Sequence, residues 1–417
     1  MTTIETVLEK SKGIGRGFDF LRVALAILIV AFHATLLTGN ESIRDTPLWF
    51  AEYALVPMFF ALSGFLITAS GMRLSLKNFL INRGMRIVPA LAVDIFICAL
   101  VIGPLMTTVP LKDYYTDHRF WSYFLNIFGY IHYQLPGVFE THINTRVNGA
   151  LWTVPYELLC YVLISFMIVF KLLKSSRSVA LLAAAMITGG VALEFGGAAL
   201  ASLPAIFGKI AHFALVSRNS QIVTAFLFGI LAYQLKDKIP YSKKLFAFCL
   251  ALCLAASLLF NVSMIDEVLS RAILLPAITY ITVFLGVSNI PIPKFFKQGD
   301  YSYGIYLYHD PFLQVIISLL PVWTAAGLWG AALTLSLGLP IVIAVACCSW
   351  HLIEKPILGL RKKYSFVARV RGVERETAMP NKPYAYDANR ADAALATVIA
   401  DSNQESGVIE KQKAANS

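Results

Sequence analysis

Apolar residues in this chain gather into long runs that are separated by short polar segments. Each run is near the roughly 20 residues that an α-helix needs to cross the hydrocarbon core of a bilayer. The runs cover 19–39, 49–70, 87–109, 149–170, 178–197, 219–235, 245–261, 269–288, 301–320 and 327–350. This pattern predicts an all-α, multi-pass membrane protein with about ten transmembrane helices.

The composition supports a membrane protein and excludes several other classes. Of the 417 residues, 57% are hydrophobic and 14% are charged, whereas a typical soluble domain has about 45–50% apolar and about 25% charged residues. So few charges cannot cover this much apolar surface in water. We therefore exclude a soluble enzyme, a disordered protein and a collagen-like fibre.

The positive charges predict how the helices are oriented. Alternate connections between the runs hold 22 Lys and Arg residues in one set and seven in the other. Cytoplasmic loops carry the excess of these residues, so we expect both termini in the cytoplasm and an even number of spans. The net charge of +10 then belongs to loops at the membrane surface rather than to a nucleic-acid-binding face. We expect a protein of the cytoplasmic (inner) membrane that contacts lipid and no nucleic acid.

Two parts of the chain are not expected to span the membrane. The connection 110–148 is the longest on the side opposite the cytoplasm, and long loops are where binding surfaces tend to be built. Its aromatic part, 119–135, is only about half long enough to cross, so we expect an amphipathic or re-entrant piece there. The chain therefore divides into a membrane domain, 1–365, and a polar, disordered cytoplasmic tail, 366–417.

Ionisable residues inside the apolar runs are the candidate functional residues, because a charge at bilayer depth costs about 2.5–3.5 kcal/mol on insertion scales. Arg22 and His33 lie eleven residues apart, which is about three helical turns, so they share one helix face about 16 Å apart. The plain alternative is a snorkelling arginine and a hydrogen-bonded core histidine. Asp94, Glu157 and His309 also lie inside the predicted spans.

Two arginines mark a second candidate site. Arg83 and Arg86 lie three residues apart at the predicted cytoplasmic start of the third span, so their guanidinium groups lie on one side of a helix. Paired guanidinium forks suit bidentate binding of phosphate groups. The alternative is that both arginines simply anchor the helix on the cytoplasmic side.

Several stretches with unusual polar residues follow one another through the membrane region. They read RGFDFLRVALAILIVAFH, FFALSGFLI, NRGMRIVPA, LWTVPYELLCY, and SYGIYLYHDP followed by WHLIEKP. Together they resemble the acyltransferase-3 family of integral membrane O-acyltransferases, over roughly residues 16–360. One position departs from the commoner family pattern, because Thr153 stands where serine is more usual.

The resemblance implies an enzyme that transfers an acyl group, commonly acetyl, from cytoplasmic acyl-CoA to a hydroxyl of a carbohydrate or another cell-envelope or secreted acceptor. It implies that Arg22 and His33 are catalytic-site residues, with Glu157 and His309 in the same site. It also implies that Arg83 and Arg86 contact the phosphates of the CoA co-substrate, with Arg22 as a further CoA-binding residue.

The chemistry of acyl transfer fits these residue types. A base must take the proton of the attacking hydroxyl, and histidine suits this role because its reference pKa of about 6.5 is near the working pH. A buried carboxylate such as Glu157 could orient the imidazole. The sequence holds no zinc- or iron-ligand pattern, so we expect no metal and no permanently bound cofactor.

Two other functions would also use polar residues inside a membrane. A multi-pass transporter of a small polar substrate predicts an internal repeat and paired broken helices, and the sequence shows no such repeat. A membrane acyltransferase with a lipid acceptor would need similar chemistry. Transfer of an acyl group from acetyl-CoA to a labelled product separates the enzyme from the transporter.

Overall fold

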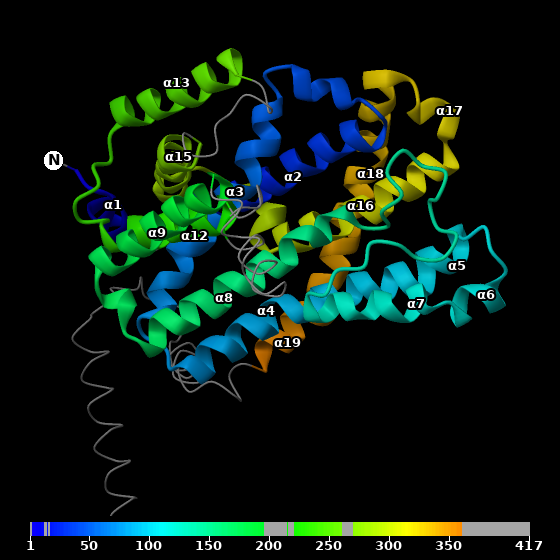
Figure 1. Ribbon diagram of the computed structural model, residues 1–417, viewed down its shortest axis with the longest axis horizontal. Helices are drawn as coiled ribbons and strands as arrows, with labels where there is room; N and C mark the ends of the chain where they lie inside the picture. The colour runs from blue at the N-terminus through cyan, green and yellow to red at the C-terminus, as the bar shows by residue number, and fades with distance from the viewer. Residues whose placement is uncertain are drawn as a thin grey trace, which may run out of the picture. The chain divides into compact units, whose positions relative to one another are not determined.

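The chain forms a bundle of helices in which each of the ten predicted apolar runs contains a helix. The computed structural model describes residues 2–11, 15, 17–195, 215, 221–260 and 270–360, and these residues contain no β-strand. Figure 1 shows the bundle. The principal helices are α2 (Gly17–Leu37), α3 (Trp49–Gly71), α4 (Leu76–Ile97), α8 (Val154–Val169), α9 (Ser176–Phe195), α12 (Gln221–Gln234), α13 (Lys243–Leu259), α15 (Leu275–Val287), α16 (Ser302–Leu319) and α18 (Gly327–Ser349). The shorter helices are α1 (Ile4–Lys10), α5 (Gly103–Met106), α6 (Leu111–Thr116), α7 (His118–Tyr123), α17 (Pro321–Thr324) and α19 (Lys355–Gly359).

The described residues confirm an all-α membrane protein. Five of their helical segments are long and apolar enough to cross a bilayer. These are Gly17–Leu37, Trp49–Gly71, Leu76–Met106, Gly149–Val169 and Gly327–Gly359. The count of ten spans and the cytoplasmic position of both termini stay predictions. The predicted tail, 366–417, lies outside the described residues.

Helix α4, which contains the third predicted span, begins earlier than its apolar run. Ser75 caps α4, its hydroxyl accepting a hydrogen bond from the backbone N–H of Asn78, and the helix starts at Leu76 rather than at the predicted residue 87. Hydropathy marks only the part of a helix that can lie in lipid, whereas the cap sets where the helix begins. Arg83 and Arg86 therefore lie well inside α4, and not at its start.

The central helix of the bundle is α16, which packs against α2, α4 and α18. Its buried side chains are unusually polar for a helix in a membrane, since His309, Asp310 and Gln314 are all 2% exposed or less. In such surroundings each polar group needs a partner within the protein. The requirement for partners places polar residues of α2 and of the loop before α8 against this helix.

Close contact between α3 and α12 is made possible by two glycines. A Cβ atom on Gly64 would lie 2.1 Å from the carbonyl oxygen of Phe226, and one on Gly229 would lie 2.0 Å from that of Ala61. Neither helix backbone leaves room for a larger side chain. Small residues at such a crossing allow the close van der Waals packing that holds membrane helices together.

The aromatic segment in the long connection forms a short helical piece rather than a span. Helix α7 continues as a 3₁₀ turn over Phe124–Phe128. Trp121 and Phe128 are 64% and 77% exposed, whereas Asn126 on the opposite side is fully buried. The segment therefore has two faces, one that packs Phe120 and Tyr123 into the protein and one that presents Trp121 and Phe128 outwards.

Replacing Gly64 with Val tests the α3–α12 contact. The added side chain must push apart two backbones, and overpacking of this kind costs about 1–3 kcal/mol, so we expect a lower melting temperature of the purified protein in detergent. Gly84→Ala is the matched control, because a Cβ there meets no atom within 4 Å and alanine favours a helix. If both variants melt like the wild type, the glycines are not needed for packing.

Candidate active site

Two histidines and an aspartate meet where α2 crosses α16. Nδ1 of His33 lies 3.0 Å from Oδ1 of Asp310 and 2.8 Å from Nε2 of His309. The side chain of His33 is 24% exposed, whereas those of His309 and Asp310 are 0% and 3% exposed. His33 is thus the member of this histidine–aspartate cluster that a substrate can reach.

The partners of the two histidines assign their protons. Nδ1 of His309 lies 2.5 Å from the carbonyl oxygen of Tyr306, which can only accept, so this nitrogen carries a hydrogen. With both imidazoles neutral, Nε2 of His309 is then an acceptor, and Nδ1 of His33 donates towards it and towards Asp310. In this tautomer Nε2 of His33 carries no proton, as a general base requires.

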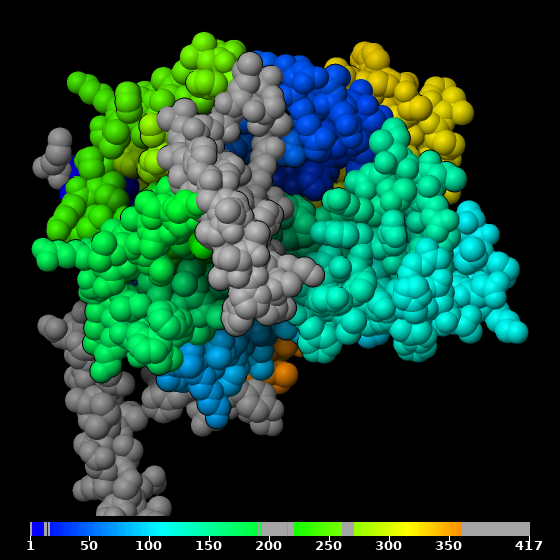
Figure 2. Space-filling model, viewed as in Figure 1, coloured from blue at the N-terminus to red at the C-terminus, as the bar shows by residue number. Residues whose placement is uncertain are grey.

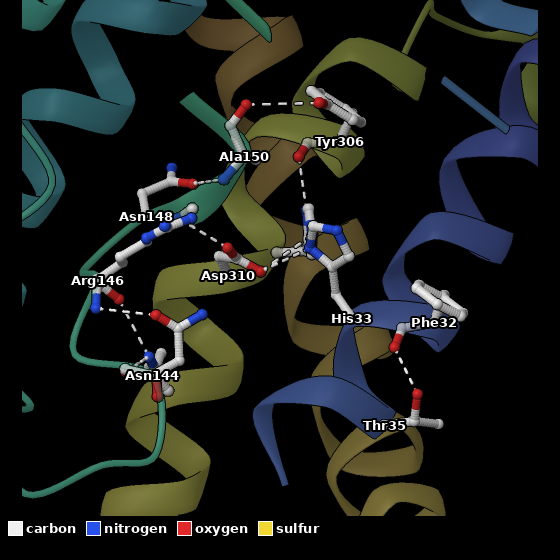
Figure 3. A network of polar contacts seen from close by, with 12 residues as sticks. Phe32, His33, Thr35, Asn144, Arg146, Asn148, Ala150, Tyr306 and Asp310 are labelled. Carbon is white, nitrogen blue, oxygen red and sulfur yellow. Dashed lines mark hydrogen bonds and ion pairs between the residues drawn. The ribbon is translucent and has the colours of Figure 1, made fainter. Parts of the chain in front are cut away.

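The other oxygen of Asp310 is held by the segment that leads into α8. The backbone N–H of Gly149 donates to Oδ2 of Asp310 over 2.7 Å. A Cβ atom on Gly149 would lie 2.6 Å from the same oxygen, so only glycine allows this close approach. Figure 3 shows Asp310 between His33 and this segment.

A proline in α16 explains why the neighbouring Asn148 is buried. Pro311 has no backbone N–H, so the carbonyl oxygen of Leu307 lacks its helical partner. Nδ2 of Asn148 donates to this oxygen over 2.9 Å and to Oδ2 of Asp94 over 2.8 Å. One amide thus satisfies two buried acceptors and fixes the loop segment that binds Asp310.

The histidine–aspartate cluster offers three atoms that could in principle bind a metal ion, all within 4.8 Å of one another. Their separations of 2.8, 3.0 and 3.2 Å are those of hydrogen bonds, whereas ligands around a tetrahedral zinc at about 2.0–2.1 Å would lie about 3.3 Å apart. These distances favour hydrogen bonds among the three side chains over binding of a metal ion. That the reaction needs no metal stays a prediction.

A second polar cluster surrounds Asp300, which lies in the connection before α16. Its Oδ2 accepts hydrogen bonds from Arg86 at 2.5 Å and from Arg22 at 3.3 Å, and its Oδ1 accepts one from the hydroxyl of Ser302 at 2.7 Å. Burial raises the pKa of Asp300, but the charges of Arg86 and Arg22 outweigh it and lower the pKa to about 2. This arginine cluster therefore keeps an ionised carboxylate at its centre.

The structure separates the predicted site residues into these two groups. His33 and His309 are in contact, and Arg22 meets Arg86 through Asp300. Glu157 accepts a hydrogen bond from Tyr161 at 2.7 Å and interacts electrostatically with Arg83 and Arg86, so it lies with the arginines. The catalytic role of Glu157 stays a prediction.

Two residues of the site were missed from the sequence. Asp310 takes the imidazole-orienting position that was suggested for Glu157, and Asp300 joins arginines from two different helices. Asp310 carried a signal, because it follows His309 directly inside an apolar run. Asp300 carried none, since an acidic residue in a polar connection is usually a solvated charge.

The comparison with protein families agrees with this geometry. A family model described as an acyltransferase domain matches residues 16–351, which include both clusters. The chain belongs to the acyltransferase-3 family. Among curated proteins, this acyltransferase is 28% identical to nodulation protein 10 of Rhizobium leguminosarum bv. viciae, over 87% of this chain and 97% of the relative. It is also 26% identical to the O-acetyl transferase of Shigella phage Sf6, over 82% of this chain and 95% of the relative. No solved structure matches the chain.

The family assignment gives both clusters a place in one enzyme. An acyltransferase must bind an acyl donor and activate an acceptor, and the protein has an arginine-rich group and a histidine with a free nitrogen at separate positions of α2. The chain is therefore a membrane acyltransferase whose buried polar residues form two chemically distinct clusters.

Proposed function

We propose that this protein transfers an acetyl group from cytoplasmic acetyl-CoA to a hydroxyl of a carbohydrate or another cell-envelope or secreted acceptor, in the cytoplasmic membrane. The observation that carries the proposal is the partly exposed His33, whose Nδ1 lies within hydrogen-bond distance of His309 and Asp310, which leaves Nε2 to act as the base. The relative named O-acetyl transferase supports oxygen as the acceptor atom and acetyl as the group.

The chemical step follows from the protonation of the histidine–aspartate cluster. As the acceptor oxygen attacks the thioester carbonyl carbon, its proton passes to Nε2 of His33. The carboxylate of Asp310, 3.0 Å from Nδ1, stabilises the imidazolium ion that forms. When the carbon–sulfur bond breaks, the imidazolium returns the proton to the leaving CoA sulfur, so His33 ends the cycle as it began.

Unpaired polar atoms around the arginine cluster support its assignment as the donor site. Within the described residues, four buried side-chain atoms near Arg86 have no hydrogen-bond partner: Nε of Arg83, the hydroxyl of Tyr303, Nε1 of Trp350 and Oε2 of Glu354. Arg86 itself lies 5.9 Å from the centre of the Trp350 ring. Buried polar groups are rarely left unpaired, so we assign the N–H and O–H donors among these atoms to the phosphates of CoA, and the acceptor Oε2 of Glu354 to an N–H group of its pantetheine arm.

The spacing of the two clusters suits a long, thin donor. Arg22 and His33 lie on the same continuous helix α2, about 16 Å apart along its axis. The pantetheine arm of CoA would run along this helix, with its phosphates at the arginines and its thioester at His33. The end of α2 at which Arg22 lies is on the predicted cytoplasmic side of the membrane. Acyl-CoA is available on that side.

Replacing His33 with Ala tests the base. We expect transfer of radioactive acetyl from acetyl-CoA into product to fall by about 10²–10⁴-fold, with the amount of protein in the membrane unchanged, because alanine is well tolerated in an apolar helix. Leu28→Ala is the matched control on α2, since Leu28 is 52% exposed and faces away from the site. More than about a third of wild-type activity in His33→Ala would make His33 a structural residue.

Replacing Arg83 or Arg86 with Lys tests the donor site. Lysine keeps the charge and hence the topology, but it removes the planar fork. A lost charge-assisted contact is worth about 1.5–3 kcal/mol, so the KM for acyl-CoA is expected to rise by about 10–150-fold while the KM for acceptor changes little. Arg73→Lys, in the same basic segment, is the control. An unchanged donor KM in both variants would show that these arginines only anchor the helix.

A further inference from the structure

The long connection between α5 and α8 encloses a cavity of about 330 Å³. The loop around it is held firmly: Asn126, which is fully buried, exchanges two hydrogen bonds with the backbone of His132, at 2.8 and 2.9 Å. The backbone N–H of Val147 donates to the carbonyl oxygen of Tyr133 at 2.8 Å. Figure 2 shows this connection (cyan to teal) as a broad part of the surface, so ligands can reach it.

The lining of the cavity carries one arginine, Arg146, that forms no ion pair within the described residues. Arg119 pairs with Asp117 at 2.8 Å and with Glu140 at 3.4 Å. Arg146 packs its guanidinium group 4.8 Å from the centre of the Tyr133 ring, and within the described ranges of the chain it has no carboxylate at ion-pair distance. Its five N–H donors therefore remain available to an anion.

A second lining residue also lacks a partner. Nε2 of His132 is buried and makes no hydrogen bond within the part of the chain that the structure describes. Polar atoms in such a position normally have a partner. A ligand with acceptor oxygens would satisfy both this nitrogen and the guanidinium group of Arg146.

The cavity adjoins the histidine–aspartate cluster through Arg146. A Cβ atom on Gly149 would lie 3.9 Å from Cδ of Arg146 and 2.6 Å from Oδ2 of Asp310, so both groups converge on the same small space. Figure 3 shows the Arg146 side chain extending towards Asp310. Gln314 lies one helical turn after Asp310 on α16. Its Nε2 donates to the carbonyl oxygen of Arg146 at 3.0 Å, which holds the backbone of Arg146 against this helix.

We propose that the cavity is the acceptor subsite and that Arg146 binds an acidic group, a carboxylate or a phosphate, of the saccharide acceptor. This inference rests on the proposed acetyl transfer to a carbohydrate and narrows the acceptor to an anionic one. Because Arg146 adjoins the same small space as Asp310, an acidic group held there brings the saccharide next to the histidine–aspartate cluster. Arg146 is then the residue that selects the acceptor, while His33 performs the proton transfer.

Saturation-transfer NMR on the purified full chain in detergent tests the subsite with simple probes. Glucuronate carries a carboxylate, glucose 6-phosphate carries a phosphate, and glucose is the neutral counterpart. Because a charge-assisted contact is lost with glucose, we expect at least one charged probe to bind about tenfold more tightly than glucose. In Arg146→Gln this preference should disappear, and in Arg146→Lys, which keeps the charge, it should persist in weaker form.

Arg44→Gln is the matched control, because Arg44 is another partly exposed arginine but pairs with Glu52 at 2.8 Å; it should keep the full preference. Equal binding of glucose and both anions by the wild type, or a preference retained in Arg146→Gln, would overturn the inference. Acetyl transfer from acetyl-CoA is measured separately on the wild type. If transfer occurs without a preference for anions, only this inference fails, and if no transfer occurs, the proposed function fails.

Discussion

The need for partners of the polar groups that α16 buries around Pro311 governs the arrangement of this site. Lipid offers no hydrogen bonds, so each such group needs a partner in the protein. Pro311 leaves the carbonyl of Leu307 free, and Asn148 fills this vacancy. That contact brings the backbone of Gly149 to Asp310, whose other oxygen faces His33. The surroundings of His33, the proposed base, thus follow from the missing backbone N–H of Pro311 and the contacts that replace its hydrogen bond.

The same need for polar partners accompanies a separation of the residues that we assign to the acyl donor from those that we assign to the acceptor. Arg22 and Arg86 form ion pairs with Asp300 at one end of α2. The histidine–aspartate cluster instead contacts the loop that leads into α8. In our account the donor enters from the arginine end and the acceptor from the loop, and they meet at His33.

The all-α membrane fold and the two histidines were predictable from local signals. Apolar runs mark helices because their length must match the bilayer, and an imidazole in such a run stands out because burying it is costly. The predicted start of α4 was wrong by eleven residues. Its capping residue lies in a polar segment, which a hydropathy pattern does not mark as helical. The contacts of Asp300 and Asn148 join residues more than 50 positions apart, and no single-sequence pattern encodes such pairs.

The most direct test of the account is the kinetic effect of Asp310→Asn. The backbone N–H of Gly149 needs an acceptor, so the amide oxygen would face Gly149 and the amide nitrogen would donate to Nδ1 of His33. The proton of His33 would then move to Nε2 and block the base. We expect kcat to fall by about 10²–10⁴-fold, with the KM for acyl-CoA unchanged because the arginine cluster is untouched. A kcat near the wild-type value, or a loss confined to the KM, would contradict the assignment of His33 as a base oriented by Asp310.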